Sequence, residues 1–435
     1  MNAKINELLP SHAFTDHKLT NFMRPQINIK RKIFNDPVYG FISINNETIF
    51  DIIEHPYFQR LRRIKQLGLT HLVYPGALHT RFHHSLGAMH LMQIAVSELT
   101  SKGHGISKEE AFGVETAILL HDIGHGPYSH ALEHSIVKGI SHEKISALFI
   151  DRFSDIFGER LEITKSIFNH TYKKQFLSKL VSSQFDMDRL DYLRRDSFFS
   201  GVSEGIINYE RLLNMLNVVN DEPVIEAKGI YSVEKFLTAR RLMYWQVYLH
   251  KTVLAAEYML MHLLKRAKEL ATEGVSLFAS PTLDYFLKNE ITFEMFQEDK
   301  SVLEQFSKLD DYDIFSAMKV WKDHPDKILS TFSKSLVDRR LFRNEIQNTP
   351  FTNEYIEEIK EKTKKQYQLT KHELGYFVFS DKTSNYAYAP GSDSINILFK
   401  DGTVNDIGNV SDDLNITLLA KPTTKYFLCY PKDIG

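Results

Sequence analysis

The sequence predicts a mainly α-helical fold that begins with an N-terminal β-hairpin and ends in a smaller α+β lobe. Apolar residues recur at helical spacing in several stretches between residues 48 and 270. Residues 27–44 and the residues after 375 instead contain short β-branched and aromatic runs bounded by turn residues. A chain of 435 residues is also long enough for a large core and about two or three domains.

The composition is that of an ordinary globular protein, with 43% hydrophobic and 25% charged residues. A net charge of −2 gives no global attraction to nucleic acid or membrane. The single cysteine, Cys429, excludes an intramolecular disulfide and suits a reducing compartment. No apolar run approaches the roughly 20 residues of a membrane span, and the first ten residues do not resemble a secretory signal. We therefore expect a soluble, cytoplasmic protein with no membrane partner.

Three segments follow from the changes in pattern along the chain. Residues 1–27 are polar and irregular and predict a mobile N-terminal extension. Residues 28–275 carry the strong helical patterns and form the predicted core. Residues 276–435 form a predicted accessory lobe with terminal β-strands, for which we expect a role in oligomer contacts.

The first elements are two short strands within residues 27–44, followed by a helical pattern that starts at Thr48. One side of this pattern is basic. Its members are Arg60, Arg62, Arg63 and Lys65. A solvated helix face is the usual explanation of such a run, and the alternative is a surface that binds polyphosphate.

The next predicted helix runs from His84 to about Leu99, and Arg81 lies just before it, where a phosphate contact is plausible. Histidines are frequent here. They are His79, His83, His84 and His90. Taken alone, each is more often a hydrogen-bonded residue than a metal ligand.

The stretch of residues 119–130 organises the rest of the chain. It follows a helix over residues 111–120 that a Ser107–Glu110 capping box opens. His121 and Asp122 end that helix about 100° apart, so both can reach one metal ion, and His125 lies one turn further on. The alternative is a buried His–Asp pair, but several polar residues inside one glycine-bent turn favour a site.

Three further helices are predicted. His142 opens a helix that runs to residue 157. In residues 186–196 the side chains of Asp188, Tyr192 and Arg195/Asp196 share a face. This fits equally a set of i,i+4 charge pairs or a cation site in which Arg189 meets anions. Residues 231–270 form the longest helical pattern, in which Arg240, Tyr244 and Tyr248 fall at i, i+4 and i+8; such an aromatic stripe is more often core than ligand box.

The sequence pattern changes in the C-terminal part. Short helical pieces reach about residue 345, and residues 354–372 form a charged helix or linker. Strands are predicted at 376–379, 395–399 and 425–430, with an Asp401-Gly402 hairpin turn.

The residue types indicate a chemistry. Two imidazoles and two carboxylates, from His84, His121, Asp122 and Asp188, form a ligand set suited to a divalent transition metal. Such a set leaves positions open for water and a phosphate oxygen. His125 and His142 could move protons near neutral pH. These residues predict metal-assisted phosphoester hydrolysis and do not identify the ester.

The chain also resembles the HD-domain phosphohydrolases, and most closely the metal-dependent dNTP triphosphohydrolases that vertebrates join to a sterile alpha motif. The resemblance covers roughly residues 30–345. It is carried by residues 32–40, 58–68, 81–87, 119–130, 142–143, 186–192 and 248–251.

The resemblance implies a reaction and its residues. A dNTP would be split at the α-phosphorus into deoxynucleoside and triphosphate, with a divalent cofactor (Mn, Fe, Mg, Co, Ni or Zn) held by the four ligands named above. His125 would be catalytic, supported by His142 and Glu133. The implied substrate-binding residues fall into two groups: Arg81, Arg189 and Arg240 would contact the phosphates, and Gln66, Tyr192 and Asp196 would hold the sugar 3′-hydroxyl. The Tyr248 ring would lie under the sugar and exclude a 2′-hydroxyl.

The resemblance also implies regulation. A dNTP or GTP activator would bind a second site at a subunit interface of a tetramer or dimer. The residues matching that site are Lys32, Glu54, Gln59 and Arg62. Phe41 and several residues between 210 and 230 depart from the family pattern.

Two other hypotheses remain open at the level of sequence. One is another HD enzyme, a nucleotide monophosphatase or cyclic-nucleotide phosphodiesterase, which would share the metal ligands. The other is a non-catalytic nucleotide sensor or single-strand nucleic-acid binder, supported by the basic runs at 30–32 and 60–65.

Overall fold

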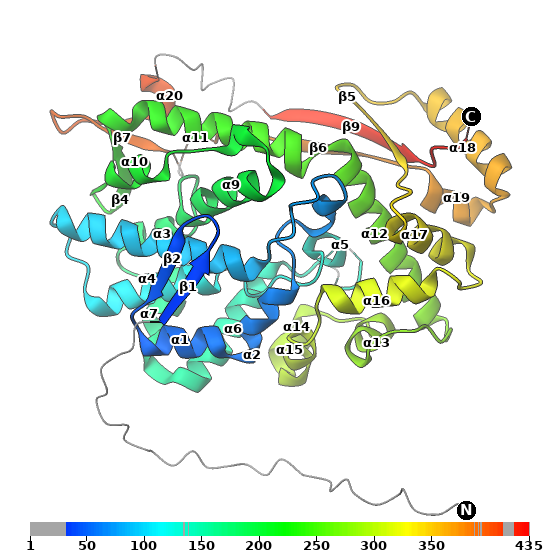
Figure 1. Cartoon of the computed structure of the whole chain (residues 1–435), viewed down its shortest axis with the longest axis horizontal. Helices are drawn as coiled ribbons and strands as arrows, with labels where there is room; N and C mark the ends of the chain where they lie inside the picture. The colour runs from blue at the N-terminus through cyan, green and yellow to red at the C-terminus, as the bar shows by residue number, and fades with distance from the viewer. Residues whose placement is uncertain are drawn as a thin grey trace, which may run out of the picture.

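The computed structural model describes residues 32–434, apart from residues 134, 138, 387, 390, 392–393 and 412–421. The predicted N-terminal extension, residues 1–27, lies outside the described residues. The fold is mainly α-helical with three small sheets, which confirms the predicted fold class (Figure 1). Within the part of the chain that is described, no helix combines the length and the apolarity needed to cross a membrane.

The N-terminal hairpin is formed by β1 (Lys32–Asp36) and β2 (Gly40–Ile44), paired antiparallel. At its turn, one carboxylate oxygen of Asp36 accepts hydrogen bonds from the backbone N–H groups of Val38 and Tyr39. This Asx-type turn is a common way for Asp to close a tight loop. The hairpin lies against α3 (Arg81–Ser101).

The helical pattern that begins at Thr48 is divided into short pieces. These are α1 (Glu47–Glu54), α2 (Pro56–Gln59) and a 3₁₀ turn, Arg60–Arg63. Pro56 cannot donate a backbone hydrogen bond to α1, so the chain restarts there, with His55 as the N-cap residue. After the break, Arg60, Leu61 and Ile64 are buried, whereas Arg62 and Arg63 are exposed.

Three helices meet at the candidate site. They are α3, α4 (Lys108–Leu120) and α9 (Met187–Ser200). Helix α3 packs on both of the others, and α4 begins with the predicted Ser107–Glu110 capping box. The core also contains α5 (Ser129–Glu133), α6 (His142–Phe157), α7 (Glu162–Phe168), α8 (Gln175–Val181) and α10 (Tyr209–Asn214).

The long helical pattern over residues 231–270 is two helices rather than one. Helix α11 (Ile230–Met243) passes into a π-helical turn, Tyr244–Tyr248, and α12 (Lys251–Thr272) follows after His250. π-Helical turns are frequent at functional sites because they re-aim side chains. Here the turn takes Tyr244 and Tyr248 out of the regular i, i+4 register that the sequence predicts.

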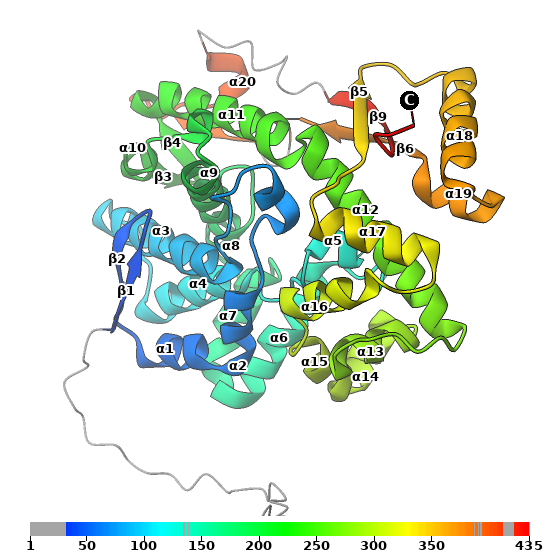
Figure 2. The same cartoon turned by 45° about the vertical axis from the view of Figure 1, so that its right-hand side comes forward.

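Part of the C-terminal segment packs against α12, through α13 (Pro281–Lys288), α17 (Lys327–Val337) and β5 (Arg343–Gln347), whereas α20 (Ile407–Val410) lies beside α11 (Figure 2). The other helices of the segment are α14 (Phe293–Glu298), α15 (Lys300–Phe306), α16 (Asp311–Trp321), α18 (Asn353–Tyr367) and α19 (Lys371–Phe377). The predicted strand at 376–379 is wrong for its first three residues, because α19, which a Thr370–Glu373 capping box starts, runs to Phe377, and β6 (Phe379–Asn385) begins only at Phe379.

Two sheets use C-terminal strands. β5 (Arg343–Gln347), β9 (Thr423–Tyr430) and β6 (Phe379–Asn385) form one antiparallel sheet. In the other, β7 (Asn396–Leu398) pairs antiparallel with β8 (Val404–Asp406), which confirms the predicted hairpin, and parallel with β4 (Glu222–Glu226), itself paired with β3 (Leu216–Val219). The C-terminal segment therefore returns to the helical core, and the domain boundary near residue 275 stays a prediction.

Candidate metal centre and active site

Four potential metal ligands converge from three helix ends. His84 lies in the first turn of α3, His121 and Asp122 follow the last residue of α4, and Asp188 lies in the first turn of α9. The His84 and Asp122 side chains are almost completely buried. Helix ends place these side chains at the point where the three helices meet, which one helix alone could not do.

The donor atoms surround one point. His84 Nε2 lies 3.1 Å from Asp188 Oδ1 and 3.7 Å from Asp122 Oδ2. His121 Nε2 lies 3.4 Å from each of His84 Nε2, Asp188 Oδ1 and Asp122 Oδ1. Ligands bonded to one ion at about 2.0–2.1 Å are separated by about 3–3.5 Å. His84, His121 and Asp122 are therefore close enough to hold one divalent ion, and Asp188 Oδ1 lies beside both imidazoles; its place as the fourth ligand stays a prediction.

Each imidazole has its second nitrogen fixed. His121 Nδ1 lies 2.6 Å from the carbonyl oxygen of Ile118, and His84 Nδ1 lies 2.7 Å from Asp191 Oδ2. A proton on Nδ1 satisfies both contacts and leaves Nε2 free as a ligand, the arrangement usual for metal-bound histidine. The role of Asp191 was not predicted; its signal was the Asp188-x-x-Asp191 spacing on one helix face.

The electrostatics of the cluster favour a cation. Burial opposes charge on His84, but hydrogen bonds that its ring donates to Asp188 and Asp191 outweigh this effect and raise the pKa of His84 to about 10. Burial opposes ionisation of Asp188 as well, yet His121 and His84 lower its pKa. Carboxylates this close require positive charge beside them, which a divalent ion would supply by displacing the protons.

His125 and His142 lie next to the metal ligands. Their rings stack with centroids 3.6 Å apart, and His125 Nε2 is 3.3 Å from Asp122 Oδ1. His125 Nδ1 contacts the hydroxyl of Ser129. Burial and the nearby Arg81 lower the pKa of His125, so its imidazole is neutral near pH 7. The side chain of Glu133, the predicted third member, lies outside the described atoms, and its role stays a prediction.

Gly124 is required by close packing of this loop. A Cβ atom there would lie 2.2 Å from the carbonyl oxygen of His142 and 2.3 Å from the backbone nitrogen of Ser146. The glycine therefore lets α6 approach the loop and bring His142 onto His125. Here it is another backbone, and not a ligand, that needs the space.

The predicted phosphate-binding residues leave buried polar atoms unpaired. Arg81 donates to Asp122 Oδ2 at 2.6 Å, but its Nε has no partner. The same holds for Nε and Nη1 of Arg240, within the described part of the chain. Buried donors are normally paired, so these N–H groups fit a bound anion. Gln66 Oε1, from the residues expected at the sugar, is a buried acceptor that also has no partner, and it fits a hydroxyl donor.

The predicted sugar-binding residues form a connected group. Tyr248 donates from its hydroxyl to Asp196 Oδ2 at 2.7 Å, and the rings of Tyr192 and Tyr248 pack edge to face at 6.0 Å. The other carboxylate oxygen of Asp196 lies 2.7 Å from His79 Nε2. His79 was seen only as one histidine in a rich segment, and its pairing with Asp196 was not predicted.

Arg189 occupies a different position from the other arginines. Its Nε donates to the carbonyl oxygen of Ser183 at 2.6 Å and lies 3.4 Å from Asp186 Oδ2. Asp186 and Tyr192 raise the pKa of Arg189 against the effect of burial. This guanidinium is thus partly neutralised by its own helix.

The predicted regulatory residues lie around α1 and α2. Arg62 Nε donates to Gln59 Oε1 at 2.8 Å, and its guanidinium lies 3.6 Å from the centre of the Phe82 ring. Glu54 is close enough to act on the charge of Arg62. Lys32 lies apart from this pair, with its ammonium 4.7 Å from the Phe50 ring centre.

The basic run at 60–65 is not one continuous solvated face, because its members have different environments. Arg60 is completely buried and donates to the carbonyl oxygens of Ile123 at 2.7 Å and His125 at 3.0 Å. Arg63 pairs with Asp310, and Lys65 Nζ lies 3.3 Å from Asp311.

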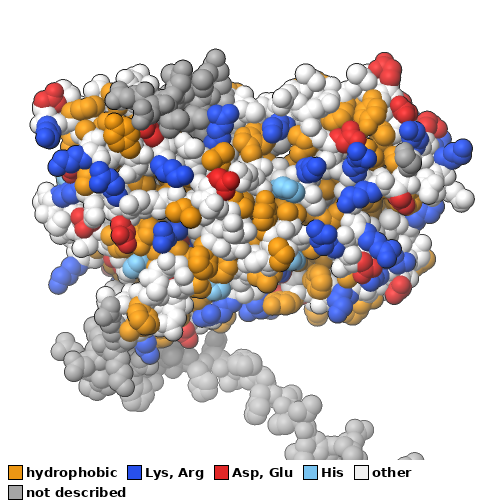
Figure 3. Space-filling view, turned by 45° about the horizontal axis from the view of Figure 1, so that its top comes forward, with side chains coloured by type: hydrophobic (Ala, Val, Ile, Leu, Met, Phe, Trp, Pro, Cys, Tyr) orange, Lys and Arg blue, Asp and Glu red, His pale blue; other side chains and the backbone are white. Residues whose placement is uncertain are grey.

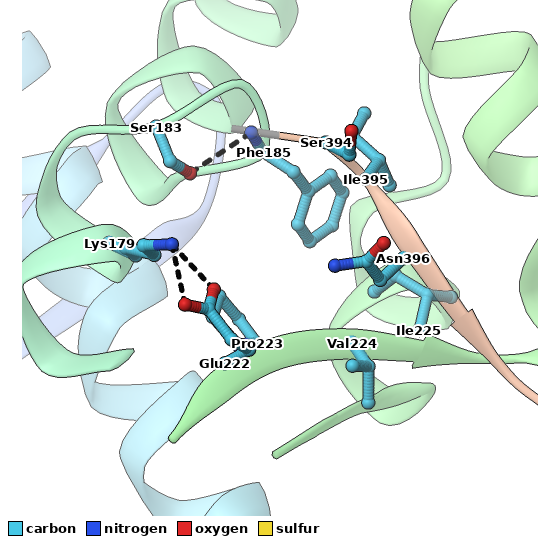
Figure 4. A pocket seen from close by; sticks show the side chains of 10 residues that line it. All are labelled: Lys179, Ser183, Phe185, Glu222, Pro223, Val224, Ile225, Ser394, Ile395 and Asn396. Atoms are coloured by element: carbon cyan, nitrogen blue, oxygen red, sulfur yellow. Dashed lines mark hydrogen bonds and ion pairs between the residues drawn. The ribbon is translucent and has the colours of Figure 1, made fainter. Parts of the chain in front are cut away.

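A small cavity lies under the segment that leads into α9 (Figure 4). It is lined by the β4 and β7 strands and by Lys179, Ser183 and Phe185. Its volume of about 20 Å³ suits one water molecule, and Lys179 is already paired with Glu222 at 2.5 Å. This cavity is too small for a nucleotide.

Helices that converge on a His, His-Asp, Asp cluster define a helical metal-dependent hydrolase. Comparison with known proteins identifies the family of hydrolases to which the chain belongs. Residues 81–195 match the HD domain family, and residues 207–279 match a family described as HD associated region. The chain belongs to the HD-domain family of phosphohydrolases.

Relatives extend over most of the chain. The Bacillus subtilis protein YwfO is 32% identical over 426 residues, 93% of each chain. A Dictyostelium discoideum protein named deoxynucleoside triphosphate triphosphohydrolase SAMHD1 homolog is 31% identical over 53% of this chain and 48% of its own. A crystal structure of a phosphohydrolase from Bacteroides thetaiotaomicron is 53% identical, with a TM-score of 0.89 over 92% of this chain and 100% of that chain.

Proposed function

We propose that this phosphohydrolase is a deoxynucleoside triphosphate triphosphohydrolase, which cleaves a dNTP into deoxynucleoside and inorganic triphosphate. The observations that carry the proposal are the Tyr248–Asp196–His79 group, in which Asp196 and His79 are buried, and the unpaired buried atoms of Arg81 and Arg240. The Asp196 carboxylate can accept a hydrogen bond from a sugar hydroxyl. The unpaired N–H groups of Arg81 and Arg240 can donate to phosphate oxygens. The likeness to proteins named as dNTP triphosphohydrolases supports the same substrate class.

Each group in the site has a part in this reaction. A divalent ion held by His84, His121, Asp122 and Asp188 would polarise a phosphate oxygen and lower the pKa of a bound water. Arg81 and Arg240 neutralise the polyphosphate. His125 is oriented by Ser129 and by the His142 ring, and its Nε2 acts as the general acid or base that transfers a proton to or from the reacting oxygen.

The sugar end sets specificity. Tyr248 presents its ring at the sugar face and, with Tyr192, closes the space where a 2′-hydroxyl would lie. Asp196 is oriented by His79 and accepts from the 3′-hydroxyl. Deoxyribose is therefore the preferred sugar.

The reaction is tested by its products. Purified protein with Mn²⁺ is given each dNTP, then each ribonucleotide, and the products are separated by anion-exchange chromatography. Deoxynucleoside with intact triphosphate supports the proposal. Orthophosphate or pyrophosphate would instead assign a monophosphatase or phosphodiesterase of the same family, and no product with any metal would leave a nucleotide sensor.

We also propose regulation by a dNTP or GTP that binds near Lys32, Glu54, Gln59 and Arg62 in a tetramer or dimer. The contact of Arg62 with Gln59 and its proximity to Glu54 support a shared site there. Turnover of one dNTP only when a second nucleotide is present, with a matching change in oligomer size, is the expected result. Equal turnover of each dNTP alone would contradict it.

Single-strand nucleic-acid binding has less support. Arg60, Arg63 and Lys65 are engaged within the protein. On the face in Figure 3, Lys and Arg side chains are scattered among acidic and apolar ones and form no continuous stripe. Phosphate-backbone binding usually needs such a stripe.

A further inference from the structure

A buried chain of charged groups joins the N-terminal hairpin to a metal ligand. At the hairpin turn, Asp36 Oδ2 lies 2.7 Å from Arg195 Nη1. Arg195 holds Asp191 with two hydrogen bonds, Nε to Oδ2 at 2.9 Å and Nη2 to Oδ1 at 3.0 Å. Asp191 Oδ2 in turn lies 2.7 Å from His84 Nδ1.

All four members are shielded from solvent. The exposed fractions are 8% for Asp36 and 0% for Arg195, Asp191 and His84. In this environment the hydrogen bonds are strong, and an unpaired member is costly. Two carboxylates balance Arg195, while Asp191 also faces His84.

The chain is packed so that its geometry is fixed. A Cβ atom on Gly87 of α3 would lie 2.0 Å from Asp191 Oδ1 and 2.2 Å from Arg195 Nη2. The Tyr39 ring lies over the guanidinium, with 5.5 Å between its centre and Arg195 Cζ. No side chain at position 87 separates α3 from the Asp191–Arg195 pair.

We propose that Asp36, Arg195 and Asp191 are positioning residues that hold His84 in the tautomer and orientation needed for metal binding, so that the hairpin turn sets the metal affinity. Asp191 keeps the His84 proton on Nδ1, and Arg195 fixes the Asp191 carboxylate. Asp36 fixes the far end of Arg195. The inference rests on the proposed function only in requiring that this site bind a divalent ion.

The direct test is the metal affinity of an Asp36→Asn variant. Metal-stripped full-length protein is titrated with Mn²⁺ by calorimetry, and free Mn²⁺ is followed by electron paramagnetic resonance. Loss of a hydrogen-bonded partner behind a metal ligand typically weakens binding about 10–100-fold. Asp36 contacts none of the four predicted ligands. A weaker Mn²⁺ affinity of the folded variant therefore supports an effect of Asp36 on His84 through Arg195 and Asp191.

A matched control separates positioning from stability. Asp326 accepts from Arg266 at 2.8 Å, between α12 and α17, and also caps α17. An Asp326→Asn variant keeps a capping side chain and loses the ion pair. We expect its melting temperature to fall with no change in Mn²⁺ affinity. Asp36→Asn with a lowered melting temperature but unchanged Mn²⁺ affinity would overturn the proposal.

A second variant keeps the test decisive if Asp36→Asn does not fold. Arg195→Lys retains the charge but cannot hold Asp191 with two parallel hydrogen bonds. Weaker Mn²⁺ binding is expected, and wild-type affinity would contradict the chain. If wild-type protein binds Mn²⁺ but hydrolyses no dNTP, the proposed substrate fails and the positioning chain stands; if it binds no divalent ion, both fail.

Discussion

In the histidines of the site, the ring nitrogen that faces away from the metal cluster is as important as the one that faces it. His84, His121 and His125 each have Nδ1 engaged, by Asp191, the Ile118 carbonyl and Ser129 respectively. Each therefore presents Nε2 to the metal cluster. Residue identity names the candidate ligands, and these partners determine which nitrogen can bind.

Replacement of His125 separates chemistry from binding. We expect His125→Ala to retain Mn²⁺ and dNTP binding and to lose about 10²–10⁴-fold in kcat, the usual contribution of a general acid or base. Calorimetry measures binding, and the product assay measures turnover. His104→Ala, at a histidine that contacts Asn217 outside the site, is the control. Unchanged turnover would remove His125 from the mechanism.

Tyr248 makes two separable contributions, its ring and its hydroxyl. Tyr248→Ala removes the ring and is expected to raise the ratio of ribonucleotide to deoxynucleotide turnover. Tyr248→Phe keeps the ring but not the hydrogen bond to Asp196, so discrimination should remain while KM rises. Competition between dGTP and GTP in one reaction measures the ratio. An unchanged ratio in Tyr248→Ala would show that the sugar lies elsewhere.

At the scale of elements, the loop that follows α4 is held by its neighbours and not by its own hydrogen bonds alone. Ser146 of α6 donates to the His121 carbonyl and accepts from the Gly124 N–H. Arg60, from the 3₁₀ turn after α2, reaches the Ile123 and His125 carbonyls. A loop fixed from two sides can hold metal ligands at a constant separation.

Arg60 is accordingly expected to be important for stability. Arg60→Met retains much of the packing between Phe149 and Phe306 but leaves buried carbonyl oxygens without donors. Each such group costs about 1–3 kcal/mol, so the free energy of unfolding should fall by about 3 kcal/mol. Chemical denaturation measures it, with the neighbouring Arg62→Met as control. Equal effects of the two substitutions would contradict a structural role specific to Arg60.

At the scale of the whole molecule, α12 links the HD core to the C-terminal residues. It packs against α5 of the core and against α17 and β5. His262 lies on this helix, stacked on Phe379 with ring centres 4.5 Å apart and edge-on to Tyr376. Burial, with a smaller effect of Lys265, lowers the pKa of His262 to about 4.

This histidine makes the contact between the two parts sensitive to acid. Between about pH 6.5 and pH 4 the unfolded chain binds a proton at His262 that the folded chain does not. Stability is therefore lost as the pH falls through this window. The melting temperature of His262→Leu should fall less between pH 7.5 and pH 5.0 than that of the wild type. The fall for His372→Leu, at an exposed histidine of α19, should equal that of the wild type. Parallel losses in all three proteins would contradict the assignment.

The sequence predicted most of the helices and the metal ligands from local signals. Capping at Ser107 and helical spacing fixed the elements around α4, while the His121-Asp122 pair and the glycines beside it marked the site. These features are readable because each depends on residues within a few positions of one another.

The sequence by itself determined the helical fold class and named the His and Asp residues that the structure places as a possible metal site. Only the tertiary structure decided that Arg60 is buried, that His79 orients Asp196 and that Asp36 is joined to His84 through Arg195 and Asp191. The contacts Arg60–Ile123, His79–Asp196 and Asp36–Arg195 join residues that are 63 to 159 positions apart along the chain. A charged side chain has no local signal for burial. Whether it faces solvent or a buried partner depends on which elements the folded chain brings to its other end.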